Sequence, residues 1–519
     1  MAKIYNMAHD IDRHANSGKE AIRWLNADGV RKSLTYSELK DWSDSLAKAM
    51  VEMGLKKGDR VMILLPRLPE AYISYMACLK AGLVVMPGSE MLRPGDIAYR
   101  LRHAGAIAVI AYHQLADRVE EAERQANPLR VKIILGSNRA GWIPFHDLKG
   151  IASTPLPQTK EDDMAFLSYT SGTTGNPKGV IHHHSWAIAH QQTTTEHWLD
   201  IRPGDVVWAT ASPGWAKWIW SPFMSTLGAG ATAFVYHGAF DAKKYLQLLE
   251  NEKISVLCCT PTEYRIMAKQ DGLAELKLHL RSAVSAGEPL NREVISIFQK
   301  YFNLKVRDGY GQTENTLLVA TLKNMKEKPG SMGKPTPGNI VAILDEDGYE
   351  VAQGEVGHIA VHRSSPALFK GYYNDPERTK QAFIGDWYLT GDRAKRDEDG
   401  YFWFEGRSDD IIISSGYTIG PFEVEDALVK HPAVKECAVV ASPDEIRGSI
   451  VKAFVILKEP EQAGDDLVQE LQEHVKNLTA PYKYPREIEF VRDLPKTASG
   501  KIRRVELRER EFQRKKSLS

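Results

Sequence analysis

The chain has 519 residues, of which 43% are hydrophobic and 26% charged, a balance typical of a globular protein with a large core. Lys and Arg together number 67, as do Asp and Glu, and a formal net charge of zero gives no electrostatic footprint for nucleic acid or anionic lipid. No run approaches the roughly 18 apolar residues of a membrane helix, and the start has no apolar signal-peptide region. Four Cys without a disulfide pattern fit a reducing compartment. We therefore expect a multidomain cytoplasmic protein with no nucleic-acid or membrane partner; its oligomeric state stays open.

Short β-rich runs alternate with helix-length segments up to about residue 330. "RVMILLP" at 60–66 predicts a strand, and "PEAYISYMACLKAG", closed by Gly82, predicts a helix. Further strands are predicted in "LVVMP", "AIAVIAY" (106–112), "VKIILG" (131–136), "DVVWATAS", "ATAFVYH", "ISVLCCTP" and "RSAVSAGE". Continuous apolar strands separated by helices indicate parallel sheets that are covered on both faces.

The pattern changes twice in the last third of the chain. From about 331 to 405, short strands and Asp-Gly turns such as "NIVAILDEDGYEV" and "DEDGYFWFEG" predict a β-rich subdomain. After "GRSDD" (406–410), "PFEVEDALVKH" and "DDLVQELQEHVKNL" predict helices, and "ECAVVAS" and "VKAFVILK" predict strands. We expect an α/β protein with an N-terminal domain at 1–408, which includes the subdomain, and a small α+β C-terminal domain at 409–519.

A Gly-rich stretch with many hydroxyls, "SYTSGTTGNPKGV", follows a predicted strand at residues 168–180. Backbone N–H groups of such a loop, its hydroxyls and Lys178 are suited to surround phosphate oxygens. The order of residues is not that of the G-x-x-x-x-G-K-[ST] loop, because Pro177 directly precedes the lysine. By composition alone the stretch would be a surface loop, so the ordering of its residues carries the prediction of a phosphate-binding loop.

Four further motifs follow along the chain: "SAGEPL" (285–290), "DGYGQTEN" (308–315), "YLTGDRAKRDEDGYFWFEGRSDDIIISSGYTIGPFEVE" (388–425) and "LPKTASGK" (494–501). Together with the Gly-rich stretch, and in this order, they resemble the adenylate-forming enzymes, a superfamily of acyl-CoA synthetases, peptide-synthetase adenylation domains and firefly-type luciferases. With "PGWAKWIW", "SPDEIRG" and "APYKYPR", the chain most resembles the medium-chain acyl-CoA synthetases. The resemblance implies that a carboxylic acid, ATP and CoA give acyl-CoA, AMP and pyrophosphate through an acyl-adenylate.

The resemblance also implies an ATP site with Mg²⁺. Thr313 is expected at the α-phosphate, and Glu314 is expected to coordinate Mg²⁺, which suits hard oxygen ligands. Asp392 is expected to accept the ribose hydroxyls, with Arg407 nearby. The other expected ATP contacts are Thr170, Ser171, Gly172, Thr173, Thr174, Gly175, Lys178, Gly287, Glu288, Pro289, Asp308, Gly309, Tyr310, Gly311 and Gln312.

A mobile C-terminal domain is implied as well, with Lys501 as the catalytic residue that acts on the breaking bond and Asp409 as the hinge. Rotation about the hinge is expected to exchange Lys501 for CoA contacts in the second half-reaction. The expected CoA contacts are Ser415, Gly416, Tyr417, Arg447 and Lys483. From composition alone, Arg447 would be a turn residue and Lys483 a surface lysine.

The size of the acid is predicted from Gly311, because acetyl-CoA synthetases place a Trp at the matching position. We expect an open pocket floor and a linear or branched acid of roughly four to ten carbons, since each buried CH₂ adds roughly 0.8 kcal/mol. Trp215 is the first candidate for acyl contact in the cluster with Trp218 and Trp220. "IHHHSW" (181–186) does not have the spacing of a zinc site.

Other functions remain open from the sequence. An aromatic acid of the benzoate type is the main rival substrate. The adenylate could instead be passed to a carrier protein or, as in luciferases, to O₂. A non-catalytic nucleotide-binding protein is a third reading, which the presence of Lys501, Glu314, Asp392 and Arg407 disfavours.

Overall fold

The computed structural model describes residues 2–150, 154–170, 176–287, 290, 292–414, 417–444, 447–479, 481–496 and 501–516. The chain divides into two compact units. The large unit comprises Met1–Val341 and His362–Phe383, and the small unit comprises Ala342–Val361 and Ile384–Ser519. The expected boundary at Asp409 lies within the small unit and stays a prediction. None of the helices in these ranges is long and apolar enough to cross a membrane.

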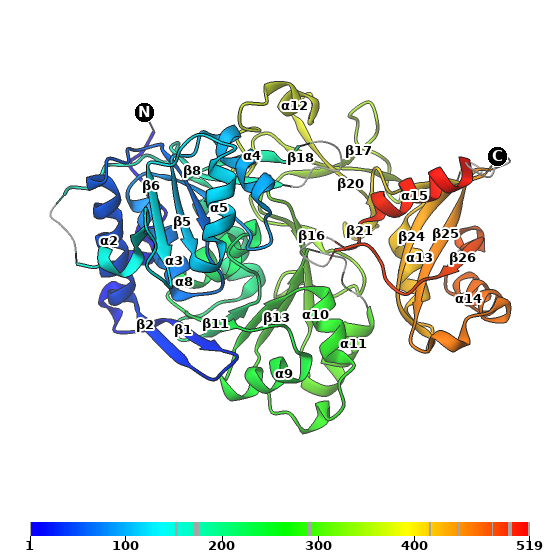
Figure 1. Ribbon diagram of the computed structural model, residues 1–519. Coiled ribbons are helices and arrows are strands. Elements are labelled where there is room, and N and C mark those ends of the chain that lie inside the picture. The colour runs from blue at the N-terminus through cyan, green and yellow to red at the C-terminus, as the bar shows by residue number, and fades with distance from the viewer. Residues whose placement is uncertain are drawn as a thin grey trace. The chain divides into compact units, whose positions relative to one another are not determined.

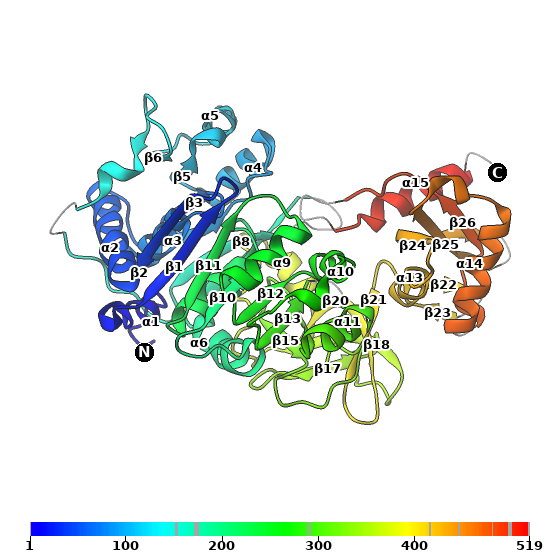
Figure 2. The same cartoon turned by 90° about the horizontal axis from the view of Figure 1, so that it is seen from below.

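Two extended sheets form the large unit, and most of their strands are parallel. The seven-stranded sheet has the order β7 (Ile143–Pro144), β6 (Val131–Leu135), β5 (Ala108–Tyr112), β3 (Arg60–Leu64), β4 (Val84–Pro87), β8 (Met164–Thr170) and β9 (Lys178–His183). The nine-stranded sheet has the order β16 (Lys334–Pro335), β15 (Leu317–Ala320), β14 (Val306–Gly311), β13 (Ser282–Ala286), β12 (Val256–Cys259), β10 (Val206–Ala209), β11 (Thr232–His237), β1 (Glu20–Asn26) and β2 (Arg31–Thr35). Figure 2 shows β2, β1, β11, β10, β12 and β13 side by side.

Helices cover both faces of these sheets, as the continuous apolar strands predict. One core lies between the seven-stranded sheet and α4 (Pro94–Ala104) and α5 (Ala116–Glu123). A second core joins the other face of this sheet to α2 (Tyr36–Glu52), α3 (Pro69–Lys80) and β1 and β11 of the nine-stranded sheet. A third core packs the nine-stranded sheet against α9 (Ala242–Asn251), α10 (Pro261–Ala268) and α11 (Arg292–Phe302), as Figure 1 shows.

Local sequence signals explain where several helices begin and end. Thr35 and Glu38 form a capping box at the start of α2, as do Thr260 and Glu263 at α10. Pro69 opens α3, and Gly82 follows it with φ +67°, a conformation that favours glycine. The shorter helical segments of the large unit are α1 (His9–Asp12), α6 (Trp186–His190), α7 (Ala216–Trp218), α8 (Thr226–Gly228), α12 (Pro376–Gln381), the π-helices η4 (Gln191–Leu199) and η5 (Ile219–Ser225), and the 3₁₀ turns Ala15–Ser17, His113–Leu115, Phe145–Leu148 and Leu273–Glu275.

The small unit combines three sheets with three α-helices in its described residues. A five-stranded sheet has the order β17 (Val341–Leu344), β18 (Val356–His362), β20 (Trp387–Arg396) and β19 (Phe383–Ile384), with β21 (Phe402–Arg407) paired to β20. The others are β22 (Ile412–Ser414) with β23 (Tyr417–Ile419), and β24 (Val434–Asp444), β25 (Gly448–Leu457) and β26 (Glu487–Phe490). The helical segments are α13 (Pro421–Leu428), α14 (Asp465–Leu478), α15 (Arg504–Lys516) and the 3₁₀ turns Pro460–Gln462 and Pro481–Lys483.

Candidate active site

The predicted phosphate loop connects two antiparallel strands of the seven-stranded sheet. β8 and β9 are in register so that Thr170 pairs with Lys178, which places the ends of the loop opposite each other. Ser171, Gly172, Thr173, Thr174 and Gly175 lie outside the described residues. The Thr170 hydroxyl is buried and has no hydrogen-bond partner among the residues that are described. Since buried polar groups are normally satisfied, this hydroxyl is suited to bind a ligand oxygen.

The second motif forms a tight turn at the end of β14. The Asn315 side-chain oxygen accepts a hydrogen bond from the Gln312 backbone N–H at 2.9 Å, and the Asn315 N–H donates to the Gln312 carbonyl at 3.1 Å. The turn carries Thr313, which is half-buried, and Glu314, of which 7% is exposed. It therefore presents a hydroxyl and a buried carboxylate from adjacent residues.

Tyr372 joins this carboxylate to the lysine of the phosphate loop. The Lys178 ammonium donates to the Tyr372 hydroxyl at 3.2 Å, and this hydroxyl donates to Glu314 Oε1 at 3.0 Å. The ammonium also lies 4.6 Å from the centroid of the Tyr372 ring, within cation–π distance. The sequence analysis missed Tyr372, because it lies far from both motifs in the chain and no local pattern marks it.

Residues 369–373 bring Tyr372 to the site by running beside β9. The Tyr373 N–H donates to the Gly179 carbonyl at 2.7 Å, and the Ile181 N–H donates to the Gly371 carbonyl at 3.2 Å. At the other end, the Phe369 N–H donates to the Glu314 carbonyl at 2.7 Å. The same short segment therefore contacts both the strand that follows the phosphate loop and the turn that carries Glu314.

The donor set fits a Mg²⁺ ion that is shared with a nucleotide. Mg²⁺ in such sites is held by one or two carboxylates and by substrate phosphates, and it keeps several waters. Glu314 supplies one buried carboxylate close to the end of the phosphate loop. Across the described ranges, no group of three or more His, Cys, Asp or Glu side chains could hold a metal by protein ligands alone. These residues would thus hold the ion only together with the phosphates that it neutralises.

The expected adenine-side residues lie at the ends of β13 and β14. Gly287 follows β13 with φ +105°, a backbone conformation that favours glycine, whereas Glu288 and Pro289 lie outside the described residues. Asp308 is buried, and this burial raises the pKa of its carboxyl from 3.8 to about 7, although the Gly309 N–H donates to Asp308 Oδ1 at 2.8 Å. Tyr310 and Gly311 complete the strand.

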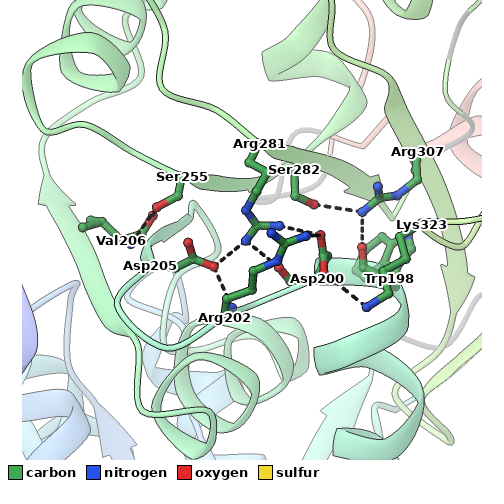
Figure 3. A network of polar contacts seen from close by, with 10 residues as sticks. All are labelled: Trp198, Asp200, Arg202, Asp205, Val206, Ser255, Arg281, Ser282, Arg307 and Lys323. Carbon is green, nitrogen blue, oxygen red and sulfur yellow. Dashed lines mark hydrogen bonds and ion pairs between the residues drawn. The ribbon is translucent and has the colours of Figure 1, made fainter.

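A buried indole supports β14, and an ion network lies next to the indole in the chain (Figure 3). The Trp198 N–H donates to the Asp308 carbonyl at 3.1 Å, and a Cβ on Gly309 would lie 2.5 Å from the Trp198 ring. Gly309 is therefore required for this close packing. Asp200, which follows in the same segment, pairs with Arg202, Arg281 and Lys323.

The sequence predicts an open pocket floor at Gly311, but two groups lie close to this residue. A Cβ on Gly311 would lie 2.2 Å from the Thr316 carbonyl oxygen and 3.1 Å from Trp220 Cη2. A larger side chain at residue 311 would thus displace backbone, and the Trp220 ring is the neighbouring side chain. Trp215 is 38% exposed, whereas Trp218 is buried against Tyr72, Tyr75 and Phe223. Trp218 is a core residue, and Trp220 joins Trp215 as a candidate for acyl contact.

In the small unit, Asp392 and Arg407 lie opposite each other. They are register partners on β20 and β21, and Arg407 Nη1 lies 4.0 Å from Asp392 Oδ1. Asp392 is buried, and Arg407 Nε also contacts Asp409 Oδ1 at 3.1 Å. The pair can present an acceptor and a donor to one ligand, as a ribose or phosphate contact requires.

The remaining residues expected to act with CoA or in catalysis also belong to the small unit. Lys501 is exposed, and Tyr417 begins β23, whereas Ser415 and Gly416 lie outside the described residues. The Arg447 N–H donates to Asp444 Oδ1 at 2.8 Å, and the buried Lys483 pairs with Glu423. Asp409 accepts a hydrogen bond at its carbonyl from Arg508 of α15. The roles of these residues stay predictions.

Comparisons with known proteins cover nearly the whole chain. The family model described as AMP-binding enzyme matches residues 11–373, and that of the AMP-binding enzyme C-terminal domain matches residues 423–501. The chain is 59% identical over 514 residues to an uncharacterized acyl-CoA ligase, YtcI, of Bacillus subtilis, covering 98% of this chain and 97% of the relative. It is 42% identical to the mitochondrial acyl-coenzyme A synthetase ACSM3 of Mus musculus, with 98% and 91% coverage.

Solved structures give the same fold over full length. A crystal structure of the anthranilate CoA ligase AuaEII in complex with anthranoyl-AMP has a TM-score of 0.91 at 29% identity, covering 98% of both chains. A benzoate CoA ligase from Burkholderia xenovorans has a TM-score of 0.86 at 31% identity, covering 97% of this chain and 100% of its own. The expected α/β architecture with parallel sheets and a separate C-terminal domain is confirmed.

Proposed function

Because this chain belongs to the AMP-binding enzyme family and is an ATP-dependent, AMP-forming acyl-CoA ligase, we propose that its acid substrate is a medium-chain or branched-chain fatty acid. The choice rests on Gly311, because it lacks the indole that restricts the acyl group in an acetate-activating enzyme. The Thr316 carbonyl and the Trp220 ring border this position, so Trp220 is the side chain that would limit the acid. We also propose that the protein is cytoplasmic.

The first half-reaction requires positioning and charge neutralisation more than proton transfer, since a carboxylic acid is already ionised at neutral pH. In the proposed site, Thr170 and Lys178 bind the β- and γ-phosphates and Thr313 contacts the α-phosphate. Glu314 holds Mg²⁺, which neutralises phosphate charge when it is bound. Asp392 and Arg407 bind the ribose, and Lys501 stabilises charge as pyrophosphate leaves. The Asp409 hinge then allows Tyr417, Arg447 and other residues of the small unit to receive CoA.

The proposal is tested by pyrophosphate release with Mg-ATP and a panel of acids from acetate to laurate, with isobutyrate and benzoate, each with and without CoA. A maximum among medium or branched acids, with turnover that requires CoA, is expected. A maximum at acetate, or thioester formation with a carrier protein but not with CoA, would contradict it.

An aromatic acid is the second candidate. It is favoured by the likeness to structures of benzoate and anthranilate CoA ligases and by the Trp220 ring beside Gly311. Replacing Trp220 by Leu separates the two candidates, since each CH₂ that gains burial adds roughly 0.8 kcal/mol, or about fourfold. If the substrate is aliphatic, Trp220→Leu raises kcat/KM for longer acids relative to butyrate. A loss confined to benzoate would instead favour the aromatic acid.

A further inference from the structure

The histidine-rich stretch after the phosphate loop forms a buried row of rings. His182 is the second-last residue of β9, and Trp186 and His190 follow at four-residue steps as the first and last residues of α6. The Trp186 and His190 rings stack at 4.5 Å with an interplanar angle of 11°, and the His182 centroid lies 5.6 Å from that of Trp186. All three side chains are at least nine-tenths buried, with 6%, 3% and 0% exposed, respectively. We call these residues the imidazole–indole column.

Each ring of the column bonds to the turn that carries Thr313 and Glu314. His182 Nε2 lies 2.6 Å from the Thr313 carbonyl oxygen, and the Trp186 N–H donates to the Asn315 carbonyl at 2.9 Å. His190 Nδ1 lies 2.6 Å from the Thr316 hydroxyl. The Glu314 carbonyl between them is bonded by the Phe369 N–H. Every carbonyl from Thr313 to Asn315 is thus fixed by a donor outside the turn.

The two histidines in the column act as neutral rings. Burial lowers the pKa of His182 to about 4 and that of His190 to about 3, so both are uncharged at neutral pH. His182 therefore donates its Nε2 proton to the Thr313 carbonyl. His190 Nε2 lies 3.0 Å from the Trp220 carbonyl, which can only accept, so Nδ1 accepts from the Thr316 hydroxyl. The column thereby holds the turn without placing a charge beside Lys178 and Glu314.

We propose that the imidazole–indole column is a set of positioning residues for the metal–nucleotide site. It fixes Thr313 and Glu314 relative to β9, so that the phosphate-loop lysine and the metal carboxylate are presented to ATP as one body. This inference rests on the proposed roles of Thr313 and Glu314. Buried carbonyls need partners in any fold, but here two of the three carbonyls are bonded by side chains of β9 and α6, which contain or follow Lys178.

The test compares two indoles that make the same hydrogen bond. Trp186→Phe keeps the stacked ring and removes the donor to Asn315. Trp24→Phe is the matched control, because the buried Trp24 N–H donates to the Arg67 carbonyl, also at 2.9 Å. The probe is Mn²⁺, titrated into the full-length enzyme with ATP and no acid and followed by electron paramagnetic resonance. Melting temperature is measured for both variants.

We expect Trp186→Phe to raise the half-saturating Mn²⁺ concentration about tenfold, as is usual when support for a metal ligand is removed, and Trp24→Phe to leave it unchanged. Equal melting shifts in the two variants with unchanged Mn²⁺ binding in both would overturn the inference. If Trp186→Phe does not fold, His182→Gln, which retains an N–H donor, and His182→Ala replace it. The Gln variant is then expected to bind Mn²⁺ more tightly than the Ala variant, and equal binding would overturn the inference.

Glu314→Gln separates this inference from the proposed function. We expect it to weaken Mn²⁺ binding more than Trp186→Phe does. Weak binding in Glu314→Gln together with wild-type binding in Trp186→Phe would refute the column's role alone. Wild-type binding in Glu314→Gln would refute the metal role of Glu314 and the inference that rests on it.

Discussion

The turn at Thr313–Thr316 in the large unit is held by neutral groups, whereas α15 in the small unit is joined to its neighbours by buried ion pairs. The carbonyls from Thr313 to Asn315 accept from imidazole, backbone and indole N–H groups, and the Thr316 hydroxyl donates to His190. In the small unit, α15 is joined to its neighbours by Lys452–Glu511 at 2.8 Å and Arg504–Glu425 at 2.6 Å. Both Lys452 and Glu511 are almost fully buried.

The use of neutral groups at the turn and of ion pairs at α15 fits the proposed role of each region. Neutral donors fix the turn while leaving the charges of Lys178 and Glu314 for phosphates and metal, since added charges nearby would compete in a poorly solvated site. Ion pairs are suited to hold a separately folded body together, because breaking one leaves an uncompensated buried charge. The two units should therefore respond differently to substitution and to pH.

The largest expected effect tests whether Lys501 acts in only one of the two half-reactions. Lys501→Ala should slow adenylate formation by about 10²–10³-fold, as loss of one transition-state donor does, because the ammonium no longer stabilises the departing pyrophosphate. Thioester formation from pre-made acyl-adenylate and CoA should stay close to wild type. Quenched-flow measurement of each half-reaction checks this, and equal loss in both would contradict the two-orientation account.

A second prediction breaks an ion pair in the small unit. Lys452→Met should destabilise this unit by about 3 kcal/mol, the lower end for a broken buried pair, because Glu511 keeps Arg514 and Ser442 as partners. Hydrogen exchange of β24 and β25 amides in the full chain is the measurement. Lys458→Met, at an exposed lysine just after β25, is the control and should change exchange little. Similar effects in both variants would refute the role assigned to the buried pair.

The same ion pair predicts sensitivity to acid. Burial acts to raise the pKa of Glu511, but hydrogen bonds from Arg514, Lys452 and Ser442 outweigh it and lower this pKa from 4.5 to about 2. Because the folded-state pKa is depressed, the stabilisation is present above pH 4.5 and is lost as pH falls toward 2. Amide exchange of β24 should accelerate across this window, and less so in Glu511→Gln; identical profiles would contradict the assignment.

Tyr372→Phe tests a neutral donor in the large unit. Loss of the hydroxyl leaves Glu314 without one hydrogen bond, so half-maximal adenylation should need about tenfold more Mg²⁺, while KM for the acid is unchanged. Tyr349→Phe, at an exposed tyrosine, is the control. A rise in KM for the acid with an unchanged Mg²⁺ requirement would place Tyr372 in the acyl pocket instead.

A last prediction concerns Asp308, whose buried carboxyl has a pKa of about 7. Because its folded-state pKa is raised, the native protein holds a proton between pH 4 and 7 that the unfolded chain has lost, and stability falls as pH rises through this window. Asp308→Asn removes that dependence, so the variant should gain in denaturation midpoint relative to wild type from pH 5 to 8. A constant difference, as expected for the exposed control Asp347→Asn, would contradict this.

The sequence predicts most of the fold because its signals are local. Apolar runs such as residues 60–66 and 131–136 correspond to β3 and β6, and the helix closed by Gly82 corresponds to α3. The Asp-Gly turn before Tyr401 correctly predicts the β20–β21 hairpin. The π-helices η4 and η5 escaped prediction, because their residues depend on contacts with distant strands rather than on a repeating pattern.

The site is only partly accessible to sequence analysis. Fixed motifs lead to Lys178, Thr313, Glu314, Asp392 and Arg407. Within the large unit, Tyr372 links Lys178 to Glu314, and within the small unit Arg407 lies beside Asp392. Tyr372 and the column could not be identified, because their role follows from long-range pairing beside β9. The Thr316 carbonyl oxygen lies so close to Gly311 that it leaves no room for a side chain there. Residue types do not predict this contact, because it depends on the path of the backbone.

The most direct test of the central claim follows an oxygen atom. Octanoate labelled with ¹⁸O in both carboxylate positions is incubated with enzyme, Mg-ATP and CoA, and the products are analysed by mass spectrometry. The acyl-adenylate route predicts one ¹⁸O in the phosphate of AMP, one in the thioester carbonyl and none in pyrophosphate. Unlabelled AMP, or label in phosphate or pyrophosphate, would contradict attack of the carboxylate on the α-phosphate.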